Sequence, residues 1–157
     1  LKLYMKLKTP FSHLLQSGVF LFLDRFFKWQ AMRAWNYPVP FNRWLGWEPF
    51  LNGGIAFGIV LPAYLVLVLS LIIIGVICYL FYLHLSLKNN ILKLVQGTGL
   101  ILILTGSVSN LADRLLYGNT IDYIRVYTGI INIADCLIVV GFVLYFWTLK
   151  QLQKNVN

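Results

Sequence analysis

"PFLNGGIAFGIVLPAYLVLVLSLIIIGVICYLFYLHLSL", residues 49–87, is a stretch of 39 residues without a charged side chain. A helix that spans a bilayer needs about 20 mainly apolar residues, so this stretch holds one span and a connection before it. The sequence between Glu48 and Lys88 therefore predicts a membrane protein.

Three more charge-free runs lie on either side of it, at residues 9–23, 94–112 and 136–149, in a chain of 157 residues that is 59% hydrophobic. We predict an all-α polytopic membrane protein with a small extracytoplasmic interfacial segment that can contain β structure. It forms a single domain over residues 1–157, with four transmembrane helices at about 11–27, 59–83, 94–112 and 131–149. The first and last runs are short for a span, so Asp24 and Asp135 are expected within the outer part of the bilayer.

The charges are distributed unevenly between the two sides of the predicted helices. One side carries seven bases and no acid, at Lys2, Lys6, Lys8, Lys88, Lys93, Lys150 and Lys154. The other side carries six bases and all five acids. Cytoplasmic loops of membrane proteins are enriched in Lys and Arg, so both termini are expected in the cytoplasm. The net charge of +8 is thus a topology signal, and no nucleic-acid partner is expected.

Residues 2–23 have the basic start and apolar run of a signal peptide, but no small-residue cleavage site follows, and we expect this segment to stay. Cys78 and Cys136 have no disulfide-like spacing, and His13 and His84 have no metal-ligand spacing. Packing thiols and the absence of a metal or other cofactor are therefore predicted.

The segment between the first two helices, residues 29–50, holds four of the five tryptophans, at Trp29, Trp35, Trp44 and Trp47. Tryptophan is enriched at membrane interfaces, so an aromatic belt that anchors the protein is the favoured interpretation. The alternative is a surface that also guides a membrane-bound substrate. The segment "TIDYIRVYTGIIN", residues 120–132, predicts a short extended or hairpin-like connection before the last helix.

The third predicted helix has one face of small and then polar residues. Gly99, Gly106, Asn110 and Asp113 fall within about 60° of one another at 100° per residue. Small residues allow close helix packing in lipid, which explains the glycines but not the polar continuation. In the next helix Asn132 and Asp135 share a face.

The chemistry that these residues permit depends on two carboxylates. A turn between Asp122 and Asp135 allows both to reach one point, where they would share a proton. Such a pair suits amide hydrolysis, with one Asp taking a proton from water and the other polarising the carbonyl. A proton relay or an ion site in a transporter uses the same pair, and the residues alone leave this open. Asn52, Asn110 and Asn132 supply hydrogen bonds for a substrate backbone.

Four motifs resemble those of the lipoprotein signal peptidase (signal peptidase II) family, in order and with compatible spacing. They are "LDRFFK" at residues 23–28, "NGGIAF" at 52–57, "SNLADR" at 109–114 and "INIAD" at 131–135. The family consists of bacterial inner-membrane aspartic proteases with four transmembrane helices. The resemblance implies cleavage of diacylglyceryl-modified prolipoproteins just before the lipidated cysteine, by a monomer that contacts membrane lipids and has its site near the extracytoplasmic face.

The resemblance also assigns residues. Asp122 and Asp135 match the catalytic dyad. Positions that bind substrate or shape the site are matched by Asn52, Gly54, Asn110, Arg114 and Asn132. Supporting positions are matched by Asp24, Lys28 and Asp113, and for the Asp24–Lys28 pair a structural i, i+4 ion pair is favoured, worth a few tenths of a kcal/mol if exposed.

The sequence departs from the family pattern at four positions. Ser107 and Ser109 stand where Gly is usual, Arg125 where an acid is common, and Ile131 where Phe is usual. Both dyad positions are spared. The competing hypothesis is a catalytically inactive relative or a small proton-coupled carrier, although four short helices offer no inverted repeat of the transporter kind.

Overall fold

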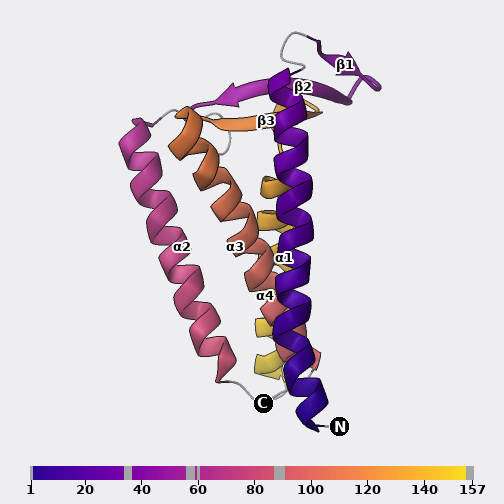
Figure 1. Cartoon of the computed structure of the whole chain (residues 1–157), viewed down its shortest axis with the longest axis vertical. Coiled ribbons are helices and arrows are strands. Elements are labelled where there is room, and N and C mark those ends of the chain that lie inside the picture. The colour runs from indigo at the N-terminus through magenta and orange to yellow at the C-terminus, as the bar shows by residue number, and fades with distance from the viewer. Residues whose placement is uncertain (1, 34–36, 56–58, 60, 87–90, 155–157) are drawn as a thin grey trace.

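The computed structural model describes residues 2–33, 37–55, 59, 61–86 and 91–154, with side chains from residue 15 onward. Its elements are, in chain order, α1 (Lys2–Arg33), β1 (Val39–Pro40), β2 (Leu45–Asn52), α2 (Ala63–Leu85), α3 (Ile91–Tyr117), β3 (Thr120–Val126), β4 (Gly129–Ile131) and α4 (Ile133–Lys154). The long helices lie alongside one another, and the strands lie across one end of them (Figure 1). The start of α1 and the end of α4 both lie at the opposite end (Figure 1).

Helix α3 contacts each of the other three helices, and glycines allow its close approach to α4. A Cβ added at Gly99 would lie 2.8 Å from the carbonyl oxygen of Gly141, and one added at Gly141 would lie 2.6 Å from that of Gly99. A Cβ at Gly106 would meet the carbonyl oxygen of Ala134 and Cγ1 of Ile138. The predicted small-residue face of the third helix is thus confirmed as a packing seam.

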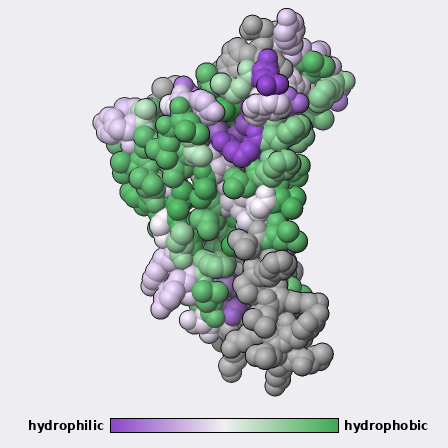
Figure 2. All heavy atoms as spheres, viewed as in Figure 1, coloured by the Kyte–Doolittle hydropathy of each residue, from purple (hydrophilic) through white to green (hydrophobic). Residues whose placement is uncertain are grey.

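Three of the described helices, α2, α3 and α4, are long and apolar enough to cross a membrane. Only 11% of the most apolar 18-residue stretch of α2 is buried inside the protein, so most of its apolar side chains face outward. Figure 2 shows hydrophobic residues over the flanks of the helices and hydrophilic residues gathered beneath the strands. These findings establish a membrane protein, whereas a spanning role for α1 stays a prediction.

The predicted helix boundaries need correction, since three of the four helices are longer than predicted. The first extends from residue 2 to 33 rather than 11 to 27, and the third from 91 to 117 rather than 94 to 112. The prediction ended helices near charges, whereas Asp24, Lys28 and Asp113 lie inside helices and are buried. The second helix starts at Ala63 rather than at 59, after its N-cap residue Pro62. The fourth spans 133–154 rather than 131–149.

The strands form one antiparallel sheet in the order β1-β2-β3-β4. The hairpin of β3 and β4 confirms the extended connection predicted for residues 120–132. The register of β2 against β3 shifts between Trp47 and Phe50, where Pro49 has no N–H to donate. As a result, Asn52 is paired with Thr120 and Phe50 with Asp122, so Asn52 and Asp122 lie on the same face of the sheet.

The tryptophan-rich segment has regular secondary structure, which an anchoring belt does not require, because it supplies β1 and β2. Trp47 packs against Tyr123 and Phe27 beneath the sheet, with ring centroids 5.2 Å and 6.3 Å away. Trp29 and Trp44 are each 48% exposed, as an interfacial residue would be, and Trp35 lies outside the described residues. The buried cluster of Ala31, Ile121 and Tyr123 joins the sheet to α1.

Candidate functional site

The two aspartates of the predicted dyad are brought to one site by the β3-β4 hairpin and the start of α4. Asp122 lies in β3, and Asp135 lies in the first turn of α4. Asn132 links them, because its Nδ2 donates to Oδ1 of Asp122 (2.6 Å) while its Oδ1 accepts the backbone N–H of Asp135 (2.9 Å).

Asn132 and Asp135 form a reciprocal cap at the start of α4. Asp135 Oδ2 accepts the backbone N–H of Asn132 (3.2 Å), which completes the pattern of a capping box. Its other oxygen, Oδ1, accepts from Nδ2 of Asn110 (2.8 Å) on α3. Both donors and the positive end of the helix dipole stabilise a negative charge on Asp135, which is partly exposed.

Asp122 is more deeply enclosed, with 1% of its surface exposed. Its Oδ2 accepts from Nδ2 of Asn52 (2.9 Å), whose own Oδ1 accepts the backbone N–H of Gly54 (2.9 Å). Burial, followed by the neighbouring charge of Asp135, raises the pKa of Asp122 from 3.8 to about 7. The site therefore holds a deeply buried carboxyl with a raised pKa, Asp122, beside a partly exposed one, Asp135, which accepts hydrogen bonds from Asn110 and from the backbone of Asn132.

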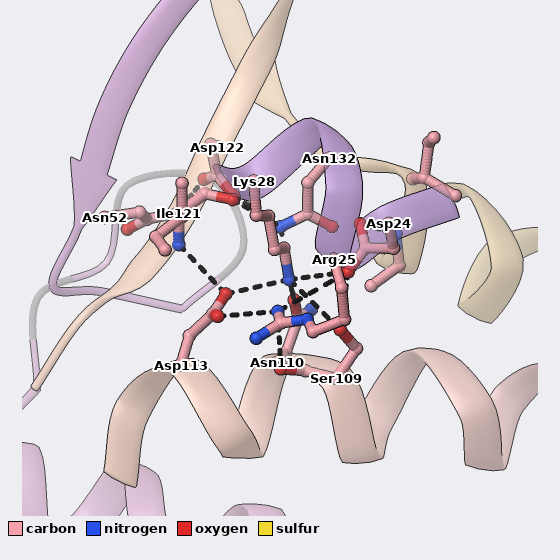
Figure 3. A network of polar contacts seen from close by, with 12 residues as sticks. Asp24, Arg25, Lys28, Asn52, Ser109, Asn110, Asp113, Ile121, Asp122 and Asn132 are labelled. Carbon is pink, nitrogen blue, oxygen red and sulfur yellow. Dashed lines mark hydrogen bonds and ion pairs between the residues drawn. The ribbon is translucent and has the colours of Figure 1, made fainter. Parts of the chain in front are cut away.

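A cluster of four charged residues lies next to this pair, joining α1 to α3 (Figure 3). Lys28 Nζ is 2.9 Å from Asp24 and 2.8 Å from Asp113, and Arg25 Nη2 is 2.6 Å from Asp113. Asp24 and Asp113 are fully buried, so the small energy considered for an exposed Asp24–Lys28 pair does not apply. A buried pair is costly to break, since removing one partner leaves a charge without compensation.

Two residues that sequence reasoning did not assign to the site complete the surroundings of Asp24. Ser109 Oγ donates to Asp24 Oδ2 (2.5 Å), and the Tyr123 hydroxyl donates to Oδ1 (3.2 Å). The backbone N–H of Ala134 also donates to Oδ1 (3.1 Å), so Asp24 helps to hold the start of α4. Ser109 stands where Gly is usual in the family pattern, and its hydroxyl has a partner here.

Arg114 and Gly54 lie at the edge of the site toward α2. Arg114 Nη1 donates to Ser70 Oγ (3.1 Å), and a small hollow lined in part by Asn52, Arg114 and Val66 opens there. Gly54 is buried at a bend of the backbone, where an added Cβ would lie 2.6 Å from the carbonyl oxygen of Ile59. Gly54 therefore allows two backbone segments to approach closely at this edge of the site.

The other departures from the family pattern have ordinary structural partners. Arg125 Nε is 3.5 Å from Glu48 Oε2 across β2 and β3, and Ile131 pairs with Ile124 between β3 and β4. No structural reason for Ser107 emerges from the described contacts. Across the described ranges, His, Cys, Asp and Glu form no group that would hold a metal ion.

These features together define a class: an integral membrane protein with a paired-carboxylate site at one end of its helices. Comparison with known proteins supplies the family. A family profile described as "Signal peptidase (SPase) II" matches residues 17–151. The chain belongs to the signal peptidase II family, and it is a membrane protease.

Curated relatives agree over most of the chain. The lipoprotein signal peptidase of Syntrophus aciditrophicus (strain SB) is 33% identical, over 90% of this chain and 94% of the relative. That of Acinetobacter baylyi (strain ATCC 33305 / BD413 / ADP1) is 32% identical, over 86% and 79%. Two solved structures, each described as a bacterial membrane enzyme, share the fold. They have TM-scores of 0.79 and 0.70, are 21% and 22% identical, and cover 93% and 88% of this chain and 92% of their own chains.

Proposed function

We propose that the protein is an aspartic endopeptidase that removes signal peptides from diacylglyceryl-modified prolipoproteins, cleaving just before the lipidated cysteine. The observation that carries this proposal is the shared partner Asn132, which binds Asp122 through its amide group and Asp135 through its oxygen. The family to which the chain belongs supports the substrate class, and the geometry of the site supports the proposed mechanism.

In the proposed mechanism the two aspartates have different roles. Asp135 is the base: it accepts a proton from water as the water oxygen attacks the scissile carbonyl carbon. Asp122 is the acid: it donates its proton to the carbonyl oxygen, which its raised pKa of about 7 supports. When the C–N bond breaks, Asp135 gives its proton to the leaving nitrogen, and Asp122 recovers a proton from the former carbonyl oxygen.

The surrounding polar residues hold the aspartates in place and bind the substrate. Asn52 and Asn110 hold the aspartates in place, and Arg114, at the edge of the hollow toward α2, is a donor for substrate carbonyl oxygens. Gly54 allows the backbone turn that orients Asn52.

We further propose the placement of the protein in the bacterial inner membrane. It is a single-domain monomer with α1 as a fourth span, both termini in the cytoplasm, and the sheet and dyad near the extracytoplasmic face. The lysine-rich ends and the position of the sheet at the other end support this orientation (Figure 1). The signal helix and the lipid of the precursor would then both approach the dyad from within the bilayer.

The test uses purified protein in detergent with a diacylglyceryl-modified prolipoprotein and its unlipidated form. Wild type should cleave only the lipidated precursor, and Asp122→Asn and Asp135→Asn should each lose cleavage while remaining folded. Glu48→Gln is the matched control, because it removes a partly exposed carboxylate of the same sheet. Cleavage that survives in either Asp variant contradicts the dyad, and no cleavage by folded wild type favours the inactive relative or carrier.

A further inference from the structure

The orientation of three asparagine side chains decides whether the two carboxylates of the site meet donors or acceptors. Asn52, Asn110 and Asn132 each direct Nδ2 at an aspartate, at distances of 2.9, 2.8 and 2.6 Å. A carboxamide turned by 180° would present an oxygen instead and repel the carboxylate. Each side-chain amide must therefore be held in its present orientation by a hydrogen bond to its oxygen.

For two of the three, the backbone does so. The oxygen of Asn52 accepts the N–H of Gly54 (2.9 Å), and the oxygen of Asn132 accepts the N–H of Asp135 (2.9 Å). These donors cannot be removed by changing a side chain, since every residue except Pro has the same N–H.

Asn110 differs, because its orientation is set by side chains. Its Oδ1 accepts from Lys28 Nζ at 2.9 Å and from Asn132 Nδ2 at 3.2 Å (Figure 3). Asn132 Nδ2 has two hydrogens but three acceptors: its shortest contact is to Asp122 at 2.6 Å, and the carbonyl oxygen of Ile121 lies at 3.3 Å. The ammonium of Lys28 is thus the closer and the charged donor to Asn110.

Lys28 is itself buried among acceptors. The residue is 1% exposed, and Nζ lies 2.9 Å from Asp24, 2.8 Å from Asp113 and 2.9 Å from Asn110, with Ser109 Oγ further away at 3.5 Å. An ammonium group has three N–H donors, so the three closest acceptors can use all of them. With two of its N–H groups bonded to the carboxylates of Asp24 and Asp113, Lys28 directs its third N–H at Asn110.

From this geometry we propose that Lys28 is a positioning residue for Asp135, acting through the amide of Asn110. Lys28 fixes Asn110 so that its Nδ2 faces Asp135 Oδ1, and Asp135 is thereby held for proton transfer. This role goes beyond the structural ion pair with Asp24, and it rests on the proposed function of Asp135 as the base.

Arg25 provides a matched control on the same helix. It contacts Asp113 at 2.6 Å and Asp24 at 3.6 Å, so it belongs to the same charged cluster. Its other contact in the cluster is the backbone oxygen of Ser109 (3.2 Å), and no hydrogen bond to Asn110 occurs among the described contacts. Arg25→Met therefore removes one positive charge from the cluster without removing the donor to Asn110.

The experiment compares Lys28→Met with Arg25→Met in detergent, measuring kcat and KM on the lipidated precursor and thermal unfolding in parallel. Below the unfolding temperature of both variants, Lys28→Met should lower kcat by about 10- to 100-fold with little change in KM. Arg25→Met should lose thermal stability but keep kcat within about threefold. Equal kcat losses in the two variants would overturn the proposal, because the effect would then come from the charge of the cluster.

A double-mutant cycle with Asn110→Ala separates orientation from general damage. If Lys28 acts through Asn110, Lys28→Met should cost little more kcat once Asn110 is Ala. If the two substitutions instead lower kcat independently, so that their losses multiply, the proposal is overturned.

Should Lys28→Met fail to fold, a second variant is available. Lys28→Met/Asp113→Asn leaves the ion pair of Asp24 with Arg25 and restores a net charge of zero to the charged cluster. That variant should fold with the same low kcat, and a wild-type kcat would refute the positioning role. Failure of wild type to cleave would instead contradict the proposed function itself.

Discussion

At Gly106, the packing of α3 against α4 is closely connected to the proposed catalytic pair. A methyl group added there would meet the carbonyl oxygen of Ala134 and would lie 2.8 Å from Cγ1 of Ile138, both on α4. Ordinary contact begins at 3.4 Å, so Gly106→Ala requires α4 to move away from α3 by about 1 Å. Ala134 directly precedes Asp135, so this movement displaces the proposed base relative to Asp122 on β3.

The expected effects follow from that displacement. Overpacking of a tight contact costs about 1–3 kcal/mol of stability. A misplacement of about 1 Å in a catalytic group costs on the order of 100-fold in rate. We therefore expect Gly106→Ala to unfold at a temperature on the order of 5 °C lower and to cleave lipidated precursor about 100-fold more slowly.

Gly75→Ala in α2 is the control, because a Cβ at Gly75 meets nothing within 4 Å. Alanine favours the helix over glycine by about 0.5–1 kcal/mol, so this variant should be as stable as wild type or slightly more so, with unchanged cleavage. The reasoning is refuted if Gly106→Ala unfolds and cleaves like Gly75→Ala.

Four further predictions concern charges. Because the mechanism needs a proton on Asp122, kcat should fall as pH rises through about 7, and a flat pH profile up to pH 9 would contradict the assignment. The same carboxyl keeps its proton in the folded protein at pH values where the unfolded chain has lost it. Stability should therefore decrease between about pH 4 and pH 7, a slope that thermal unfolding of Asp122→Asn should lack. Asp24→Asn breaks a buried network and should cost about 3–5 kcal/mol in denaturant unfolding, whereas a loss below 1 kcal/mol would indicate that the pair is replaceable. Arg125→Gln removes a partly exposed ion pair with Glu48 and should change stability by less than about 1 kcal/mol and cleavage by less than twofold, measured side by side with wild type.

The sequence allowed good prediction where local patterns decide the structure. The charge-free runs located α2, α3 and α4, because a bilayer requires long apolar segments. The spacing of Gly99 and Gly106 located the packing face, and the β-branched residues after Asn119 located the hairpin.

Contacts between residues far apart in the sequence were harder to predict from local patterns. The strand containing Trp47 pairs with β3, far along the chain, and its composition alone resembled an interfacial belt. The contact of Lys28 with Asp113 joins two helices whose mutual rotation no single helix pattern defines. Two local signals were nevertheless present: an i, i+4 charge pair within an apolar helix, and the sequence Asn-x-x-Asp, which marks a capping box at Asn132.

The pairing of Asp24 with Lys28 also bears on how the protein enters the membrane. Ribosomes make α1 first, whereas Ser109, a later partner of Asp24, follows 85 residues further along the chain. During that interval α1 has no α3 to compensate its charges. Lys28, one turn from Asp24 on the same helix, is a counter-ion that α1 carries from the start. With α1 as the proposed fourth span, the pair makes α1 tolerable to lipid before its permanent neighbours are synthesised, and the same lysine is then available to α3 when the bundle assembles.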